Sequence, residues 1–177
     1  MEKKLQAKKL ILIYVFTALM IGIDQLTKYI AVYNIDRGHR NTVIKGFFYL
    51  TYCENTGAAW SILTGKTVFL AIVSLVSAAV ICFILHHATS LPLGFGLGAI
   101  LAGALGNMID RFFRGFVVDF LDFDIFGYNF PIFNFADICV VCGCIGLALT
   151  VILSGDRKLL LRPKIFGKSK GDKDGNN

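Results

Sequence analysis

Four long apolar runs constrain the fold of this chain more than any other feature of its sequence. They cover residues 10–33, 67–85, 91–109 and 133–153. A helix needs about 20 apolar residues to cross the hydrocarbon core of a bilayer, and each run is close to that length. Charged residues make up 17% of the chain, below the roughly 25% of soluble domains. The sequence therefore predicts a single all-α integral membrane domain over residues 1–177, with four transmembrane helices.

Positive charge is concentrated near the two ends of the chain. Of the 18 Lys and Arg residues, 11 lie within residues 1–9 and 155–177. Cytoplasmic flanks of membrane helices carry an excess of Lys and Arg, so we expect both termini in the cytoplasm, as four spans require. Basic segments beside membrane spans attract anionic lipid, so membrane lipids, and not nucleic acid, are the expected partners. The polar composition of residues 155–177 also predicts a basic disordered tail.

The five cysteines lie mostly in apolar surroundings, which indicates packing residues rather than a disulfide framework. The spacing of Cys139, Cys142 and Cys144 resembles that of metal ligands. However, Asp137 is the only carboxylate or histidine close to them in the sequence. We therefore expect neither a metal nor another cofactor.

Two links between the runs are rich in aromatic residues, and the charge argument puts both outside the cytoplasm. Residues 41–52 contain β-branched and aromatic residues interrupted by Gly46, which favours strands. They predict a small extracytoplasmic β-sheet that rests on the outer leaflet. Residues 110–132 mix eight Phe and Tyr residues with charges, which predicts an amphipathic surface segment.

Polar residues lie at the ends of the first and third runs, where contact with lipid is costly. An ionisable group in such a place indicates a functional site by default. Asp24 and Lys28 are four residues apart, so they share a helix face and are expected to form an ion pair. Asn107 and Asp110 are three apart and also share a face. Arg111 follows directly and is a candidate partner for another carboxylate.

Two further aspartates, Asp119 and Asp137, lie where apolar segments meet the membrane surface. Asn134 is well placed to cap the last helix, which puts Asp137 in the first turn of that helix. A hairpin of the last two helices brings Asp110, Asp119 and Asp137 to one membrane level. Two neighbouring carboxylates separate their pKa values and suit acid–base chemistry. Periodicity leaves open which two of the three converge.

Five motifs in this order resemble the bacterial lipoprotein signal peptidases, also called type II signal peptidases. The motifs are Asp24-Gln25-Leu26-Thr27-Lys28, Asn55-Thr56-Gly57-Ala58-Ala59-Trp60, Gly103-Ala104-Leu105-Gly106-Asn107-Met108-Ile109-Asp110-Arg111, Val117-Val118-Asp119-Phe120 and Phe133-Asn134-Phe135-Ala136-Asp137. Each motif alone is weak, whereas five in register are specific. One departure is Ala102, where the family usually has the first Gly of a pair.

The resemblance implies an aspartyl endopeptidase of the bacterial cytoplasmic (inner) membrane, with its active site near the extracytoplasmic face. Its substrates would be lipid-modified prolipoproteins, cut just before the lipobox Cys that carries diacylglycerol, and globomycin would inhibit it. We expect a monomer. The resemblance assigns catalysis to Asp119 and Asp137, and only the resemblance sets Asp110 aside. The residues it assigns to substrate binding or support are Asp24, Lys28, Asn55, Gly103, Asn107, Asp110, Arg111, Asn134 and Ala136.

Two other classes of protein fit parts of the pattern. A proton-coupled transporter uses acids as relays, but these would lie near the middle of the bilayer. Here the acids are at the ends of spans on one face, which suits chemistry at the membrane surface better. A membrane scaffold would not need paired acids. Cleavage of a lipidated lipobox peptide would separate the three classes.

Overall fold

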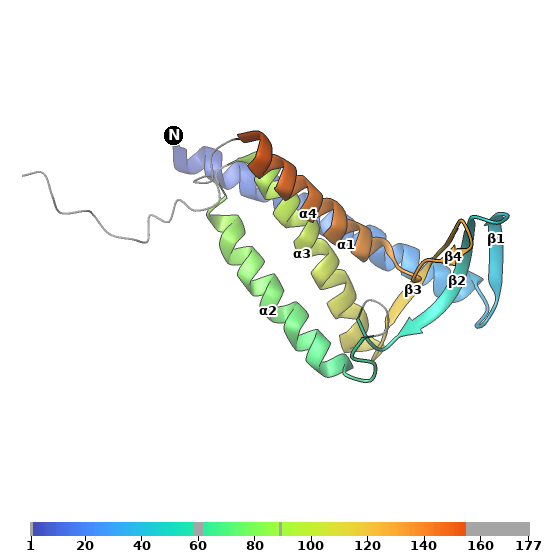
Figure 1. Cartoon of the computed structure of the whole chain (residues 1–177). Helices are drawn as coiled ribbons and strands as arrows, with labels where there is room; N and C mark the ends of the chain where they lie inside the picture. Colours follow the sequence, from blue (N-terminus) through green and yellow to red (C-terminus); the bar gives the residue numbers. More distant parts are fainter. Residues whose placement is uncertain (1, 59–61, 89, 155–177) are drawn as a thin grey trace, which may run out of the picture.

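A computed structural model describes residues 2–58, 62–88 and 90–154 of the chain. It contains a bundle of four helices with a small antiparallel sheet at one end (Figure 1). Two expectations lie outside the described residues. These are the end of the second motif, Ala59 and Trp60, and the basic tail at 155–177.

Within the described residues, the four helices match the four apolar runs. They are α1 (Glu2–Asn34), α2 (Thr67–His86), α3 (Leu91–Phe113) and α4 (Phe135–Ser154). Each is long and apolar enough to cross a membrane, which confirms the predicted number of candidate spans. The main difference from the sequence pattern is that α3 continues to Phe113, past its apolar run. Polar residues of its last turns therefore remain helical and face the sheet end of the bundle.

The third helix, α3, packs against each of the other three. Its small residues permit the closest approach, which is to α4. A Cβ atom added at Gly103 would collide with the backbone oxygen of Ala136 and the side chain of Val140. One added at Gly143 of α4 would lie 2.7 Å from the backbone oxygen of Gly96. The two backbones therefore touch, and this contact sets the distance between the polar ends of α3 and α4.

The sheet joins the two links that the sequence placed on the same side of the membrane. Its strands are β1 (Arg40–Ile44), β2 (Phe48–Asn55), β3 (Val117–Ile125) and β4 (Tyr128–Asn129), in the order β1-β2-β3-β4. All neighbours are antiparallel. Gly46, at a φ of 78°, makes the turn between β1 and β2, as its place in the sequence predicted.

The amphipathic surface segment expected at residues 110–132 is wrong, because most of this stretch belongs to α3, β3 and β4. β3 lies between β2 and β4 in the sheet. Val117 and Val118 at the start of β3 are buried. Val118 packs with Ala31 and Ile35 near the end of α1. The prediction failed because β2, which supplies the backbone partners of β3, lies more than sixty residues earlier in the chain.

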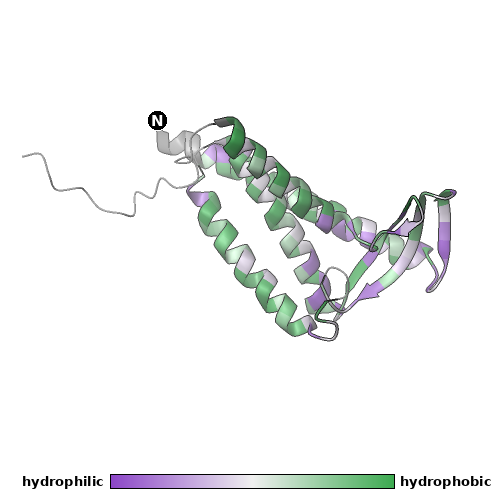
Figure 2. Ribbon diagram, in the orientation of Figure 1, coloured by the Kyte–Doolittle hydropathy of each residue, from purple (hydrophilic) through white to green (hydrophobic). Residues whose placement is uncertain are grey.

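Figure 2 shows how hydropathy divides the molecule. Hydrophobic residues cover most of the four helices, whereas hydrophilic residues are frequent in the sheet and at the helix ends beside it. The N-terminal end of α1 lies at the opposite end of the bundle from the sheet (Figure 1). The molecule therefore has one polar end that is built from both links and from the ends of α3 and α4.

Candidate active site

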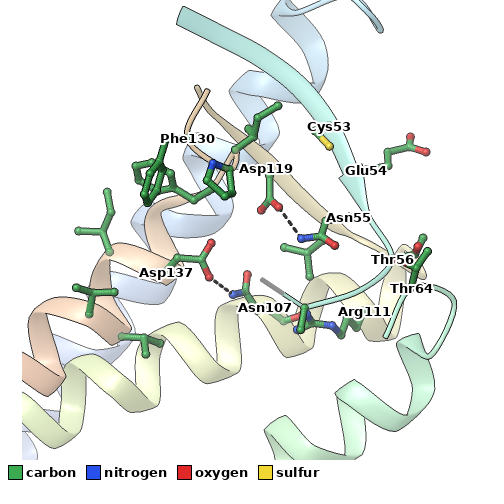
Figure 3. A pocket seen from close by; sticks show the side chains of 18 of the residues that line it. Cys53, Glu54, Asn55, Thr56, Thr64, Asn107, Arg111, Asp119, Phe130 and Asp137 are labelled. Atoms are coloured by element: carbon green, nitrogen blue, oxygen red, sulfur yellow. Dashed lines mark hydrogen bonds between the residues drawn. The ribbon is translucent and has the colours of Figure 1, made fainter. Parts of the chain in front are cut away.

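A cavity of about 780 Å³ lies where the sheet meets the ends of α3 and α4. Polar side chains from four elements line it (Figure 3): Asn55 of β2, Asp119 of β3, Asn107 and Arg111 of α3, and Asp137 of α4. Apolar side chains from residues 130–133 and from the first turns of α4 complete much of the lining. The structure thus brings two of the three candidate acids into one cavity.

Asp119 lies in the buried first half of β3, opposite Cys53 of β2. Its Oδ1 accepts a hydrogen bond from Asn134 Nδ2 at 2.6 Å, and its Oδ2 accepts one from Asn55 Nδ2 at 2.9 Å. Burial and then the negative charge of Asp137 raise the pKa of Asp119 from 3.8 to about 6, although both amide bonds lower it. Asp119 therefore holds a proton more readily than an exposed aspartate does.

Asp137 occupies the first turn of α4 and shares a capping box with Asn134. The backbone N–H of Asp137 donates to Asn134 Oδ1 at 3.1 Å, and the backbone N–H of Asn134 donates to Asp137 Oδ2 at 3.2 Å. The predicted helix cap is therefore confirmed. Asp137 Oδ1 accepts a further bond from Asn107 Nδ2 at 2.9 Å. Two N–H donors, one on each oxygen, therefore hold this carboxylate in place at the start of α4.

Asp110 lies behind the cavity in a buried ion network. Its Oδ2 is 3.0 Å from Lys28 Nζ and accepts the backbone N–H of Val118 at 3.1 Å. Its Oδ1 is 2.6 Å from Arg114 Nη1. Asp110 does not line the cavity. The structure therefore separates it from the other two acids, which periodicity could not do, and gives it contacts that fix the start of β3.

The expected ion pair between Asp24 and Lys28 is confirmed, with Nζ 3.0 Å from Asp24 Oδ2 and both side chains buried. Asp24 Oδ1 also accepts the backbone N–H of Ala136 at 2.9 Å, which joins α1 to the start of α4. Gly106 leaves room for this contact, because an added Cβ would lie 2.5 Å from Asp24 Oδ2. Asp24, Gly103 and Ala136 thus hold helices together and do not line the cavity.

Arg111 lines the cavity and binds backbone carbonyls rather than a carboxylate. Its Nη2 donates to the oxygen of Gly57 at 3.0 Å, and its Nη1 donates to that of Asn107 at 3.4 Å. The Nε atom is buried and has no hydrogen-bond partner among the described residues. Arg111 therefore ties the turn after β2 to α3 and keeps one buried donor beside the cavity.

Sequence reasoning missed two members of the network behind the cavity. Gln25 Nε2 donates to Asp24 Oδ2 at 3.0 Å and to the carbonyl of Gly106 at 3.2 Å. Arg114 pairs with Asp110, and the spacing of four residues along a helix could have identified this pair. For Gln25 the only indication was its place inside the first motif, which is weaker evidence than helical spacing.

The fold and the cavity together define a multi-pass membrane protein with Asp119 and Asp137 in one pocket at one end of its helix bundle. No group of three or more His, Cys, Asp or Glu in the described ranges is arranged to hold a metal ion. The profile of the family described as Signal peptidase (SPase) II matches residues 16–153, so the chain belongs to this family. Membership makes it a membrane protease that removes signal peptides from prolipoproteins.

Curated relatives and solved structures agree with this assignment. The chain is 42% identical over 146 residues to a lipoprotein signal peptidase of Enterococcus faecalis, which covers 81% of this chain and 89% of that protein. It is 43% identical over 146 residues to one of Bacillus pumilus, covering 81% and 94%. A bacterial membrane enzyme solved by the in meso method at 2.3 Å superposes with a TM-score of 0.73 at 35% identity, covering 91% of this chain and 94% of that one. A second, solved at 1.9 Å, has a TM-score of 0.69 at 38% identity and covers 81% and 92%.

Proposed function

We propose that this signal peptidase is an aspartic endopeptidase whose catalytic pair is Asp119 and Asp137. It cuts a diacylglyceryl-modified prolipoprotein just before the lipidated Cys of the lipobox. The observation that carries the proposal is the presence of Asp119, which is buried, and Asp137, which is half-buried, in one cavity with different surroundings. Burial raises the pKa of Asp119, whereas Asp137 lies in the first turn of α4 and accepts two N–H donors.

Different surroundings suit the two steps of peptide hydrolysis. Asp137 acts as the general base: it accepts a proton from a water molecule, and the oxygen of that water attacks the carbonyl carbon of the scissile peptide. Asp119 is protonated, so it donates a hydrogen bond to the carbonyl oxygen as negative charge develops there. When the tetrahedral intermediate collapses, the carbon–nitrogen bond breaks and the leaving nitrogen takes up a proton from the pair. Two close carboxylates share one proton in this way because both cannot ionise easily.

The residues around the pair are proposed to position the substrate. Asn55, Asn107 and Asn134 orient the carboxylates by the hydrogen bonds described above. The buried Nε of Arg111 is a donor that a carbonyl group of the substrate would satisfy. The apolar lining at 130–133 and on α4 suits the acyl chains and the small lipobox side chains.

The proposed placement puts both termini in the cytoplasm and the sheet with the cavity near the extracytoplasmic face of the cytoplasmic membrane. It is supported by Lys8 and Lys9, which lie at the end of α1 remote from the sheet. We further propose that the protein acts as a monomer. Globomycin-type inhibitors are proposed to bind the same cavity, whose volume is in the range of small-molecule sites.

Cleavage of a diacylglyceryl lipobox peptide by the purified protein tests this proposal. Asp119→Asn and Asp137→Asn should each lower kcat by about 1,000-fold or more while the protein stays folded. Asp122→Asn is the matched control, because Asp122 is a buried acid on the same strand that pairs with Arg40 away from the cavity. Wild-type turnover by either cavity variant would rule out the catalytic pair. Mass spectrometry of the products, with and without globomycin, gives the position of the cut.

A further inference from the structure

Lys28 is fully buried, and each N–H bond of its ammonium group has an acceptor. Its Nζ lies 3.0 Å from Asp24 Oδ2, 3.0 Å from Asp110 Oδ2 and 2.9 Å from Asn107 Oδ1. An ammonium has three N–H bonds, and the three oxygens provide one acceptor for each of them. Lys28 and Arg114 together balance the charges of the two carboxylates, Asp24 and Asp110. The third bond goes to a neutral amide, whose other end reaches the cavity.

This third bond determines how the amide of Asn107 is oriented. An ammonium can only donate, so the atom of Asn107 that faces Lys28 must be the oxygen. Asn134 Nδ2 donates to the same oxygen at 3.1 Å, which reinforces the orientation. The amide nitrogen therefore points the other way and donates to Asp137 Oδ1 at 2.9 Å. The amide of Asn107 thereby holds the carboxylate of Asp137 in one orientation.

We propose that Lys28 is a positioning residue for peptide hydrolysis: through Asn107 it keeps an N–H donor on Oδ1 of Asp137 and so holds this carboxylate in the orientation in which it acts as the base. The inference rests on the proposed catalytic pair. Lys28 does not touch the substrate. Its effect is transmitted by one side chain, from a buried cation on α1 to the carboxylate at the start of α4.

The charge of Lys28 also reaches the other carboxylate. The charged or titratable groups around Asp119 are Asp137 of α4, Lys28 of α1, Arg111 of α3 and Cys53 of β2. Lys28 lowers the pKa of Asp119, against the stronger effects of burial and of Asp137. Removal of this positive charge would therefore raise the pKa further. Cleavage requires protonated Asp119. The pH at which the cleavage rate declines on the alkaline side would therefore also be higher.

The test compares Lys28→Met with Thr17→Val in detergent, using a diacylglyceryl lipobox peptide. Thr17 is a suitable control because it is also buried on α1 and bonds α3 at the carbonyl of Gly98, far from the cavity. Lys28→Met should lower kcat by about 100-fold, the scale of a misplaced reacting group, with KM changed by less than about twofold. The alkaline limb of its pH–rate profile, the range in which the cleavage rate falls as the pH rises, should move to higher pH. Thr17→Val should leave kcat and the limb unchanged.

A folded Lys28→Met protein with wild-type kcat and an unmoved alkaline limb would overturn the inference, as would an equal loss in Thr17→Val. If Lys28→Met does not fold, the double variant Lys28→Met/Asp24→Asn replaces it, with Asp24→Asn as its reference. Asp110 remains paired with Arg114 at 2.6 Å in that variant, so the buried charge stays balanced. The kcat and the alkaline limb of the double variant are then compared with those of Asp24→Asn, and the same outcomes support or overturn the inference.

The catalytic pair is assayed in parallel, so that two failures can be told apart. Turnover by Asp119→Asn or Asp137→Asn would refute the proposed function itself. If both are inactive and the Lys28 variants still behave like their references, only the positioning role of Lys28 fails.

Discussion

Asn134 links the two cavity acids directly: its Nδ2 lies 2.6 Å from Asp119 Oδ1, while its Oδ1 accepts the backbone N–H of Asp137 at 3.1 Å. The side-chain amide thus caps α4 and donates to the carboxylate of Asp119, while the backbone N–H of the same residue donates to the carboxylate of Asp137 at 3.2 Å. The side chain is fully buried, so its orientation is fixed by its partners. The helix cap and the proposed acid–base chemistry therefore depend on the same residue.

Substitution of Asn134 should separate these two roles. Asn134→Ser keeps a side-chain oxygen that can cap α4, because Ser is as good a cap as Asn. It lacks the amide Nδ2 that donates to Asp119, so kcat should fall by about tenfold, the scale of one lost hydrogen bond. Asn134→Ala should show the same loss and an additional destabilisation of about 1 kcal/mol. Thermal unfolding in detergent and peptide cleavage check both, and equal unfolding temperatures for the two variants would contradict the capping role.

The pH dependence of cleavage should report the state of Asp119. Its pKa is raised to about 6, so Asp119 loses its proton as the pH rises through that value, and kcat/KM of the free enzyme should decline there. The hydrogen bond from Asn55 stabilises the ionised form and lowers this pKa. Asn55→Ala should therefore move the alkaline limb to higher pH. A movement to lower pH would show that another group controls the limb.

The contact between α3 and α4 should tolerate no side chain at Gly103. Gly103→Ala places a Cβ against the backbone oxygen of Ala136 and the side chain of Val140. We expect a loss of about 1–3 kcal/mol in unfolding free energy from overpacking, and reduced cleavage as Asn107 moves away from Asp137. Gly146→Ala on α4 is the control. An added Cβ there meets nothing within 4 Å, and Ala is the better helix former, so stability should be unchanged or higher.

Asp110 and Asp119 should respond differently to the same substitution. Asp110→Asn breaks a buried ion network with Lys28 and Arg114, so it should destabilise the protein by about 3 kcal/mol or more. The folded enzyme should still cleave the peptide within about tenfold of the wild-type kcat, because Asp110 takes no part in proton transfer. Asp119→Asn should instead abolish cleavage. Inactivity of a demonstrably folded Asp110→Asn enzyme would restore Asp110 as a catalytic candidate.

The local parts of the fold could be predicted from the sequence. The four apolar runs gave the helices, the spacing of Asp24 and Lys28 gave their ion pair, and Asn134 was correctly identified as a cap. Each of these depends on residues within a few positions of one another, or on a contiguous run. Hydropathy and helical spacing are sufficient in such cases.

The non-local parts could not be predicted in the same way. β3 was mistaken for a surface segment because its alternating aromatic residues also fit an amphipathic segment, and its partner β2 is remote in the sequence. The bond from Lys28 to Asp110 crosses from α1 to α3, which spacing along one helix cannot show. The choice of Asp119 over Asp110 depended on resemblance to a family. The three-dimensional arrangement adds physical support for this choice, since Asp110 is paired with Lys28 and Arg114 outside the cavity.

The hydrogen bond between Asp24 and the backbone N–H of Ala136 has a consequence for biogenesis. Asp24 is on α1 and Ala136 is on α4, so Asp24 leaves the ribosome long before Ala136. The second acid, Asp137, follows Ala136 directly. We therefore expect a nascent chain to be proteolytically inert until α4 has entered the bilayer and docked on α1. Chains arrested at increasing lengths and assayed for lipobox cleavage would show activity only after that step, so a half-inserted protease cannot cut its neighbours.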